Sequence, residues 1–152
     1  VLYNFTTTRK VTLNMMIEHA KSVRLGVSKS LMVVDMPYNT YRTKSEALKN
    51  CKKVMKETKC DAVKLEGGIK IKKIIETLTK NKIPVMGHLG LLPQSVRGKF
   101  KSKGKSDREI KQIMRDAKII EKSIAKDYGF WTRVGQSLEE GLLSNIFSLS
   151  IQ

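Results

Sequence analysis

The chain has 152 residues, and a hydrophobic share of 40% is enough for one packed domain or for part of a larger one. Its formal net charge of +16 is spread over every predicted helix, and the one dense basic cluster, RGKFKSKGK at 97–105, contains a single aromatic residue. We therefore expect solvated helix faces and no nucleic-acid partner, with a basic loop that attracts an anionic substrate as the alternative. No apolar run approaches the about 20 residues of a membrane span, so no membrane partner is expected either.

The two cysteines favour a reducing compartment. Cys51 and Cys60 lie nine positions apart, one in a predicted helix and one at the start of a predicted strand. This spacing fits neither a zinc site nor a disulfide framework, and the first residues, VLYNFTTTRK, lack the charged-then-apolar order of a secretory signal. We expect free thiols and a cytoplasmic location.

The first predicted element is a helix over 11–26, which Gly26 is expected to end. Its apolar residues have the i, i+3, i+4, i+7 spacing of one helix face. They are Leu13, Met16, Ile17 and Ala20. A strand follows at 31–36, and then Thr43 and Glu46 have the spacing of a capping box that begins a second helix. The inward-facing residues of that helix are Ala47, Leu48, Cys51, Val54 and Met55.

A second strand is predicted at 60–66, where Gly67 and Gly68 then turn the chain into a third helix. A glycine pair can cradle a phosphate, but a tight turn between strand and helix is the interpretation we favour. The inward-facing residues of the third helix are Ile71, Ile74, Ile75 and Leu78. A third strand is predicted at 83–88.

After the basic cluster, Ser106 and Glu109 form another capping box and predict a fourth helix. Its apolar residues are Ile110, Ile113, Met114, Ala117 and Ile120. The pattern breaks after Ala125, where KDYGFWTRVGQSLEEG shows no strand, and the final LLSNIFSLSIQ suits either a helix or a strand. We expect an irregular carboxyl-terminal tail.

Strands that alternate with amphipathic helices predict an α/β fold with a parallel sheet. Three complete strands do not close a barrel, and Val1-Leu2-Tyr3 resembles the end of a strand that begins upstream. We therefore interpret residues 1–125 as a partial (β/α)₈ TIM-barrel catalytic domain, an internal piece of a larger barrel. Residues 126–152 are interpreted as a divergent tail.

Polar side chains stand at the carboxyl ends of all three predicted strands. They are Asp35, Lys64 with Glu66, and His88. Carboxyl ends of parallel strands are where α/β folds place their chemistry. Because adjacent strands lie about 4.8 Å apart, Asp35 and Glu66 are expected to approach one divalent cation together.

Each of these residues also has a purely structural alternative. Asp35 precedes Met36-Pro37 and can cap a turn. Lys64 and Glu66 share a strand face and can form an ion pair, and His88 can be a hydrogen-bonded structural histidine.

Four segments resemble consecutive motifs of the ketopantoate hydroxymethyltransferase family, also called 3-methyl-2-oxobutanoate hydroxymethyltransferases. They are VTLNMMIEHAKSV, LMVVDMPYNTY, DAVKLEGG and IPVMGHLGLLPQSV, and the similarity runs from about residue 1 to residue 122. The resemblance implies a TIM barrel, of which this chain would supply about strands 2 to 5 and their helices. It also implies transfer of a hydroxymethyl group from 5,10-methylenetetrahydrofolate to 3-methyl-2-oxobutanoate, giving 2-dehydropantoate for pantothenate and coenzyme A biosynthesis.

The same resemblance assigns roles to the residues at the strand ends. It implies that Asp35 binds Mg²⁺ and substrate, that Lys64 binds substrate, that Glu66 binds Mg²⁺, and that His88 is an active-site histidine. A 2-oxo acid can chelate Mg²⁺ through its carboxylate and keto oxygens, and the cation would stabilise the enolate formed when the neighbouring carbon loses a proton. The resemblance further implies a homo-oligomer in the intact family.

Two departures from the family pattern shape the expectation for this chain. The family's Gly-Asp-Ser-Leu-Gly metal-binding segment would precede Val1, and its catalytic glutamate would fall near 130–140, where YGFWTRVGQSLEE does not reproduce the expected strand. Neither Glu139 nor Glu140 is therefore assigned as the base, and we expect the chain by itself to be inactive. The alternatives are another Mg²⁺-dependent enolate enzyme, of the isocitrate lyase type, and a non-enzymatic basic remnant.

Overall fold

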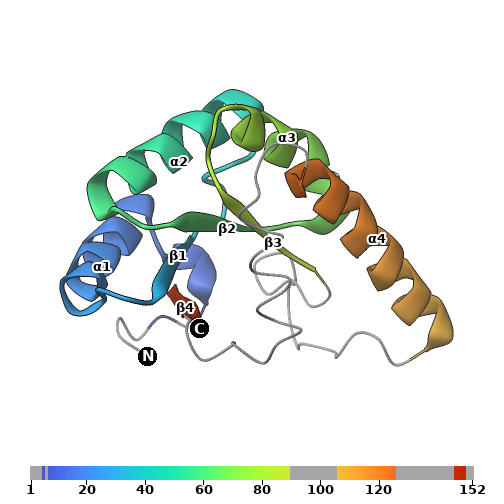
Figure 1. Ribbon diagram of the computed structural model, residues 1–152, viewed down its shortest axis with the longest axis horizontal. Helices are drawn as coiled ribbons and strands as arrows, with labels where there is room; N and C mark the ends of the chain where they lie inside the picture. Colours follow the sequence, from blue (N-terminus) through green and yellow to red (C-terminus); the bar gives the residue numbers. More distant parts are fainter. Residues whose placement is uncertain (1–4, 6, 90–105, 126–145, 150–152) are drawn as a thin grey trace.

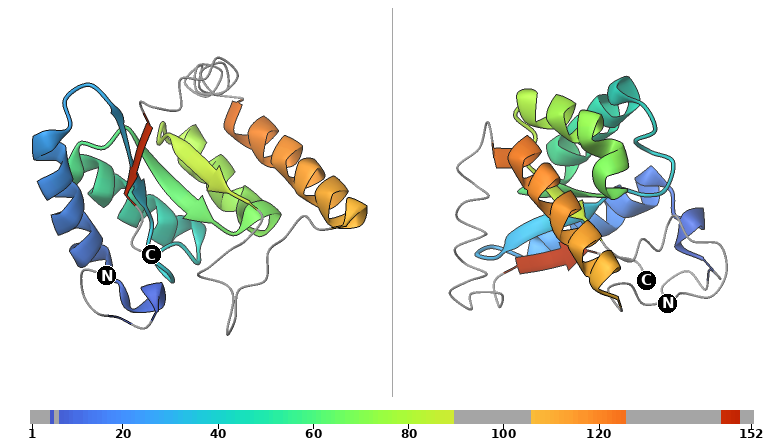
Figure 2. Two further views of the ribbon diagram at one scale, coloured as in Figure 1. Left: turned by 90° about the horizontal axis from the view of Figure 1, so that it is seen from below. Right: turned by 90° about the vertical axis from the view of Figure 1, so that its right-hand side faces the viewer.

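Four parallel strands form one sheet in the order β3-β2-β1-β4, in a computed structural model that describes residues 5, 7–89, 106–125 and 146–149. The strands are β1 (Leu31–Asp35), β2 (Ala62–Glu66), β3 (Val85–His88) and β4 (Ile146–Leu149). The helices are α1 (Leu13–Gly26), α2 (Lys44–Thr58), α3 (Lys72–Lys80) and α4 (Asp107–Ala125), with short 3-10 helices η1 (Thr8–Lys10) and η2 (Gly68–Ile71). The four helices form an arc over one face of the sheet (Figure 1). Seen from below, the strands lie in front of α2 and α3, with α1 and α4 at the two sides (Figure 2, left). The predicted alternation of strands and helices is thus confirmed over β1 to β3.

Side-chain caps begin the first two long helices. The hydroxyl of Thr12 accepts a hydrogen bond from the Met15 amide at 3.2 Å, and that of Thr43 accepts one from the Glu46 amide at 3.1 Å. The second helix therefore begins where the capping box predicts, although the Glu46 carboxylate accepts from the amide of Arg42 (2.9 Å), one residue earlier than in a standard box. Each such cap stabilises its helix by about 1 kcal/mol.

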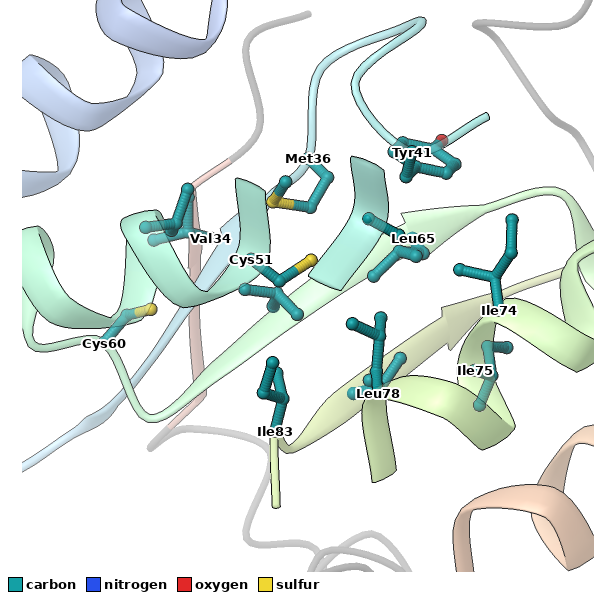
Figure 3. Close-up of a cluster of buried hydrophobic side chains, with 14 of the residues drawn as sticks. Val34, Met36, Tyr41, Cys51, Cys60, Leu65, Ile74, Ile75, Leu78 and Ile83 are labelled. Atoms are coloured by element: carbon teal, nitrogen blue, oxygen red, sulfur yellow. The ribbon is translucent and has the colours of Figure 1, made fainter. Parts of the chain in front are cut away.

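The main core lies between the helices and one face of the sheet (Figure 3). Alternate residues of the strands, Val34, Leu65 and Val85, are fully buried there against the predicted inward faces of the helices. The buried helix residues are Met16, Ile17, Ala20, Ala47, Cys51, Val54, Ile74, Ile75 and Leu78. Full burial of a large apolar side chain contributes about 1.5–3 kcal/mol, so these predicted faces account for much of the fold's stability. Cys51 and Cys60 are buried free thiols, as expected.

The apolar face of α4 differs from the prediction. Ile110 and Met114 are 43% and 57% exposed, whereas Ile120 and Ile124 near the end of the helix are buried. The carboxyl-terminal part of α4 packs closely on β3, where a Cβ atom on Gly87 would lie 2.8 Å from the Cγ2 of Ile120. The glycine allows this close approach of helix and strand.

The carboxyl-terminal tail is not wholly irregular, because β4 pairs in parallel with β1 along its outer edge. The register runs from Leu31 opposite Ile146 to Val34 opposite Leu149. An open strand edge presents unpaired N–H and C=O groups, and β4 satisfies those of β1. Residues 1–3, the basic cluster at 97–105 and the stretch 126–145 lie outside the described residues. Within the described ranges, no helix has the length and apolar character needed to cross a membrane.

Candidate functional site

The carboxyl ends of β1, β2 and β3 bring the four predicted site residues to one edge of the sheet. Asp35, Glu66 and His88 are the last residues of these strands. Since side chains alternate along a strand and Leu65 faces the helices, Lys64 and Glu66 lie on the opposite face of β2. The same alternation places Asp35 and His88 on that face. The structure therefore groups all four on the sheet face away from the helices.

The register of the sheet decides which of these side chains meet. Asp35 lies opposite Lys64, and the Lys64 Nζ is 3.0 Å from the Asp35 Oδ2. Glu66 lies opposite His88, where the distance from Glu66 Oε2 to His88 Nδ1 is 3.7 Å, too long for a hydrogen bond. The site thus consists of two cross-strand pairs. They adjoin on β2, where Lys64 and Glu66 are successive residues on the same face. The Asp35 and Lys64 side chains are 17% and 18% exposed, so this ion pair is largely shielded from water.

Burial and the nearby ammonium group decide the charge of His88. Burial lowers the pKa of His88, the positive charge of Lys64 lowers it further, and the carboxylate of Asp35 acts in the opposite direction. The imidazole is therefore neutral at pH 7. Its contact with Glu66, whose side chain is 6% exposed, is not an ion pair at that pH.

The two carboxylates are suitable ligands for a hard cation, but they are not direct neighbours. Asp35 and Glu66 stand diagonally on adjacent strands, roughly 8 Å apart at the backbone from a strand spacing of about 4.8 Å and a rise of about 3.3 Å per residue. A cation held by both would have to span this diagonal between a short aspartate and a longer glutamate, and oxygen donors suit Mg²⁺. In the described part of the chain, no group of three or more His, Cys, Asp or Glu side chains is close enough to hold a metal. The shared metal site therefore stays a prediction.

Tyr41 is a residue of this region that the sequence analysis did not identify. It is buried, and its hydroxyl donates to the backbone oxygen of Glu66 at 3.0 Å and accepts from the Glu66 amide at 3.2 Å. Burial raises the pKa of Tyr41 to about 12, so the phenol stays protonated. The available signal was Pro37, which comes two residues after the end of β1 and has no N–H to donate to a sheet, so the end of β2 needs another partner.

The glycine pair after β2 adopts conformations that other residues rarely occupy. Gly67 has φ 147° and Gly68 has φ 55°. A Cβ on Gly67 would also lie 2.8 Å from the Cγ2 of Ile71. This geometry explains both glycines as the tight turn favoured above.

Comparison with known proteins gives a consistent result. A model of the family described as ketopantoate hydroxymethyltransferase matches residues 1–126. A Pelagibacter ubique (strain HTCC1062) protein named 3-methyl-2-oxobutanoate hydroxymethyltransferase is 60% identical over 146 residues, which cover 96% of this chain and 54% of the relative. Proteins of the same name from Rhizobium etli and Prosthecochloris aestuarii are 50% and 43% identical, covering 79% and 81% of this chain and 45% and 47% of the relatives.

The match to the Pelagibacter ubique protein takes in most of the stretch after residue 126, where the match to the family model ends. The chain spans about half the length of the curated relatives it matches. The matched motifs contain the residues at the ends of β1, β2 and β3. The chain belongs to the ketopantoate hydroxymethyltransferase family.

Proposed function

We propose that this chain supplies part of the active site of a 3-methyl-2-oxobutanoate hydroxymethyltransferase. The reaction transfers a hydroxymethyl group from 5,10-methylenetetrahydrofolate to 3-methyl-2-oxobutanoate and yields 2-dehydropantoate, for pantothenate biosynthesis. The observation that carries the proposal is the pairing of Asp35 with Lys64 and of Glu66 with His88 at adjoining strand ends, in a chain 60% identical to a relative of that name.

In this proposal Asp35 and Glu66 hold Mg²⁺, because their oxygens have the right chemistry and share a sheet face. When bound, the cation would supply a Lewis acid that stabilises negative charge on the keto oxygen of the oxo acid. Asp35 also borders the substrate, since the largely buried Lys64 ammonium lies beside its carboxylate.

Lys64 is proposed to bind the carboxylate of the oxo acid. An ammonium ion is a compact point charge that does not require a planar partner, so it can attract the substrate while retaining Asp35 as a neighbour. His88, neutral at pH 7, can then donate one hydrogen bond and accept another at the substrate. The base that removes the substrate's proton is not assigned to any described residue.

The wider architecture is proposed on the same basis. Residues 1–125 would form about strands 2 to 5 of a (β/α)₈ barrel with their helices, and 126–152 would form a divergent tail, of which β4 pairs with β1. Support comes from three parallel strands alternating with helices that cover a single face of the sheet, as the outer helices of such a barrel do (Figure 1). The intact protein is proposed to form a homo-oligomer.

The experiment is a binding measurement on this chain with Mn²⁺ as a paramagnetic probe for the Mg²⁺ site. Electron paramagnetic resonance would count bound Mn²⁺ with and without 3-methyl-2-oxobutanoate, for the wild type and for Asp35→Ala. The control is Glu57→Gln, which removes a carboxylate from a surface pair with Lys21.

We expect the oxo acid to strengthen Mn²⁺ binding in the wild type and in Glu57→Gln. Asp35→Ala should weaken binding at least about tenfold, which is a loss of about 1.4 kcal/mol. Equal Mn²⁺ affinity in Asp35→Ala and the wild type would refute the metal assignment. Enhancement by isocitrate in place of the branched oxo acid would favour an enzyme of the isocitrate lyase type.

A further inference from the structure

We propose that Tyr41 is a positioning residue for Glu66: its phenol completes the hydrogen bonding of β2 beyond the end of β1, and so directs the Glu66 carboxylate toward His88. The consequence for substrate chemistry rests on the proposed function. The positioning itself rests on hydrogen bonds among described residues.

The backbone of β2 extends one step beyond its partner strand. The amide of Met36 donates to the backbone oxygen of Lys64 at 2.8 Å, which is the last bond between β1 and the chain at β2. In a parallel sheet the N–H and C=O groups of alternate residues point to the same neighbour, so those of Glu66 point toward the chain after Met36. That chain has turned away at Pro37, whose oxygen accepts from the amide of Thr40 at 3.2 Å.

The hydroxyl of Tyr41 takes the place of the missing strand. One phenol can both donate and accept, and Tyr41 uses both capacities on the two backbone groups of Glu66, at 3.0 and 3.2 Å. Its ring lies over β2 beside Leu65 (Figure 3), and the preceding residue is tied to α2 by a bond of 2.7 Å from the Asn50 side-chain amide to the Thr40 oxygen. Tyr41 lies in the loop between β1 and α2, but its side chain is therefore held in place by the buried core.

This bonding bears directly on the carboxylate because Glu66 is the last residue of β2. Beyond Glu66 the chain turns at Gly67, whose positive φ takes the backbone out of the strand conformation, so the sheet hydrogen bonds do not continue there. Without the phenol, the N–H and C=O of Glu66 would each lose a hydrogen-bond partner in a buried position, and the peptide would tilt to recover that bonding. Because the Glu66 side chain is almost fully buried next to His88, such a tilt would change the carboxylate–imidazole contact.

The test uses nuclear magnetic resonance on the 152-residue chain at a fixed pH of about 7.5, well above the ordinary pKa of a histidine side chain. The variants are Tyr41→Phe, Glu66→Gln as the reference for a lost carboxylate, and Tyr38→Phe as the matched control. Tyr38 is on the same loop and its ring contacts Arg9, a contact that phenylalanine retains. The measured signals are the Glu66 amide exchange rate and the ring ¹⁵N shifts of His88, with His19 on α1 as an internal reference.

Tyr41→Phe should speed exchange of the Glu66 amide at least about tenfold and move the His88 ring signals toward their positions in Glu66→Gln. Tyr38→Phe should change neither, and His19 should stay constant throughout. If Glu66→Gln moves the His88 signals but Tyr41→Phe leaves them in place, the positioning role is overturned and Tyr41 is only a structural partner of the strand.

Two further measurements test the role of Tyr41 if Tyr41→Phe does not fold and separate it from the proposed metal site. If Tyr41→Phe does not fold, 3-fluorotyrosine at position 41 keeps the hydroxyl but weakens its oxygen as an acceptor. We expect it to shift the Glu66 amide and His88 signals part of the way, and unchanged signals would overturn the proposal. Mn²⁺ binding is measured separately and should weaken about tenfold in Tyr41→Phe. A wild type that binds no Mn²⁺ would refute the proposed metal site, while the His88 signals still decide the role of Tyr41.

Discussion

Replacing Lys64 by methionine removes the ammonium that faces Asp35 and keeps most of the length of the side chain. The carboxylate of Asp35, only 17% exposed, would then lose its cationic neighbour. We expect this single change to destabilise the fold and also to weaken binding of the 2-oxo acid, because the same ammonium is proposed to attract the substrate.

The size of the effect follows from the geometry of the pair. At a separation of 3.0 Å the two charges attract by about 5–6 kcal/mol if the effective dielectric constant is about 20. Desolvation of both ions offsets most of this gain. Removing one partner of a fully buried pair costs about 3–5 kcal/mol, and this pair keeps some contact with water, so we expect Lys64→Met to cost about 2–4 kcal/mol. Asp35→Asn should cost a similar amount.

The assay is a double-mutant cycle by urea denaturation followed by circular dichroism. The double variant Asp35→Asn/Lys64→Met leaves no charge behind and should lie within about 1 kcal/mol of the wild type. The coupling free energy should therefore be at least about 2 kcal/mol. Additive effects within about 0.5 kcal/mol would refute the reasoning, because they would mean that the two charges do not interact in solution.

Other substitutions test the packing of two glycines, the ionisation of a buried thiol and one helix cap. Gly87→Ala should lower the free energy of unfolding by about 1–3 kcal/mol, because its Cβ would meet Ile120 at 2.8 Å. Gly26→Ala, which meets nothing within 4 Å, should be neutral or stabilising in the same denaturation assay. Burial raises the pKa of the Cys51 thiol from 9.0 to about 12, so only the unfolded thiol ionises between those values and stability should fall as pH rises through them. From pH 8 to 10 the wild type should lose about 1.4 kcal/mol more than Cys51→Ala, and equal losses would contradict this. Thr43→Ala should cost about 1 kcal/mol in thermal denaturation through loss of the helix cap, and an unchanged midpoint would count against that bond.

Most of the elements could be predicted because their signals are local. Helix α2 begins at the capping residue Thr43, and its predicted face supplies the buried Ala47 and Val54. Apolar spacing and caps act over one or two turns, so they can be identified without knowing what the helix packs against. The prediction failed for the face of α4, since Met114 has apolar character at the right spacing but no partner among the described residues sufficient to bury it.

The sequence by itself determined that polar residues stand at the carboxyl ends of the three strands and, by alternation, that Lys64 and Glu66 share a strand face. The tertiary structure added Asp35 and His88 to that face. Only the tertiary structure decided the register, which pairs Asp35 with Lys64 and Glu66 with His88. Register depends on how separate strands align, and no local pattern encodes it here. The role of Tyr41 was hidden for the same reason, because its hydroxyl bonds the backbone of a residue 25 positions away. The physical cause is that periodicity reports the direction of a side chain, whereas its partner is chosen by contacts between distant segments.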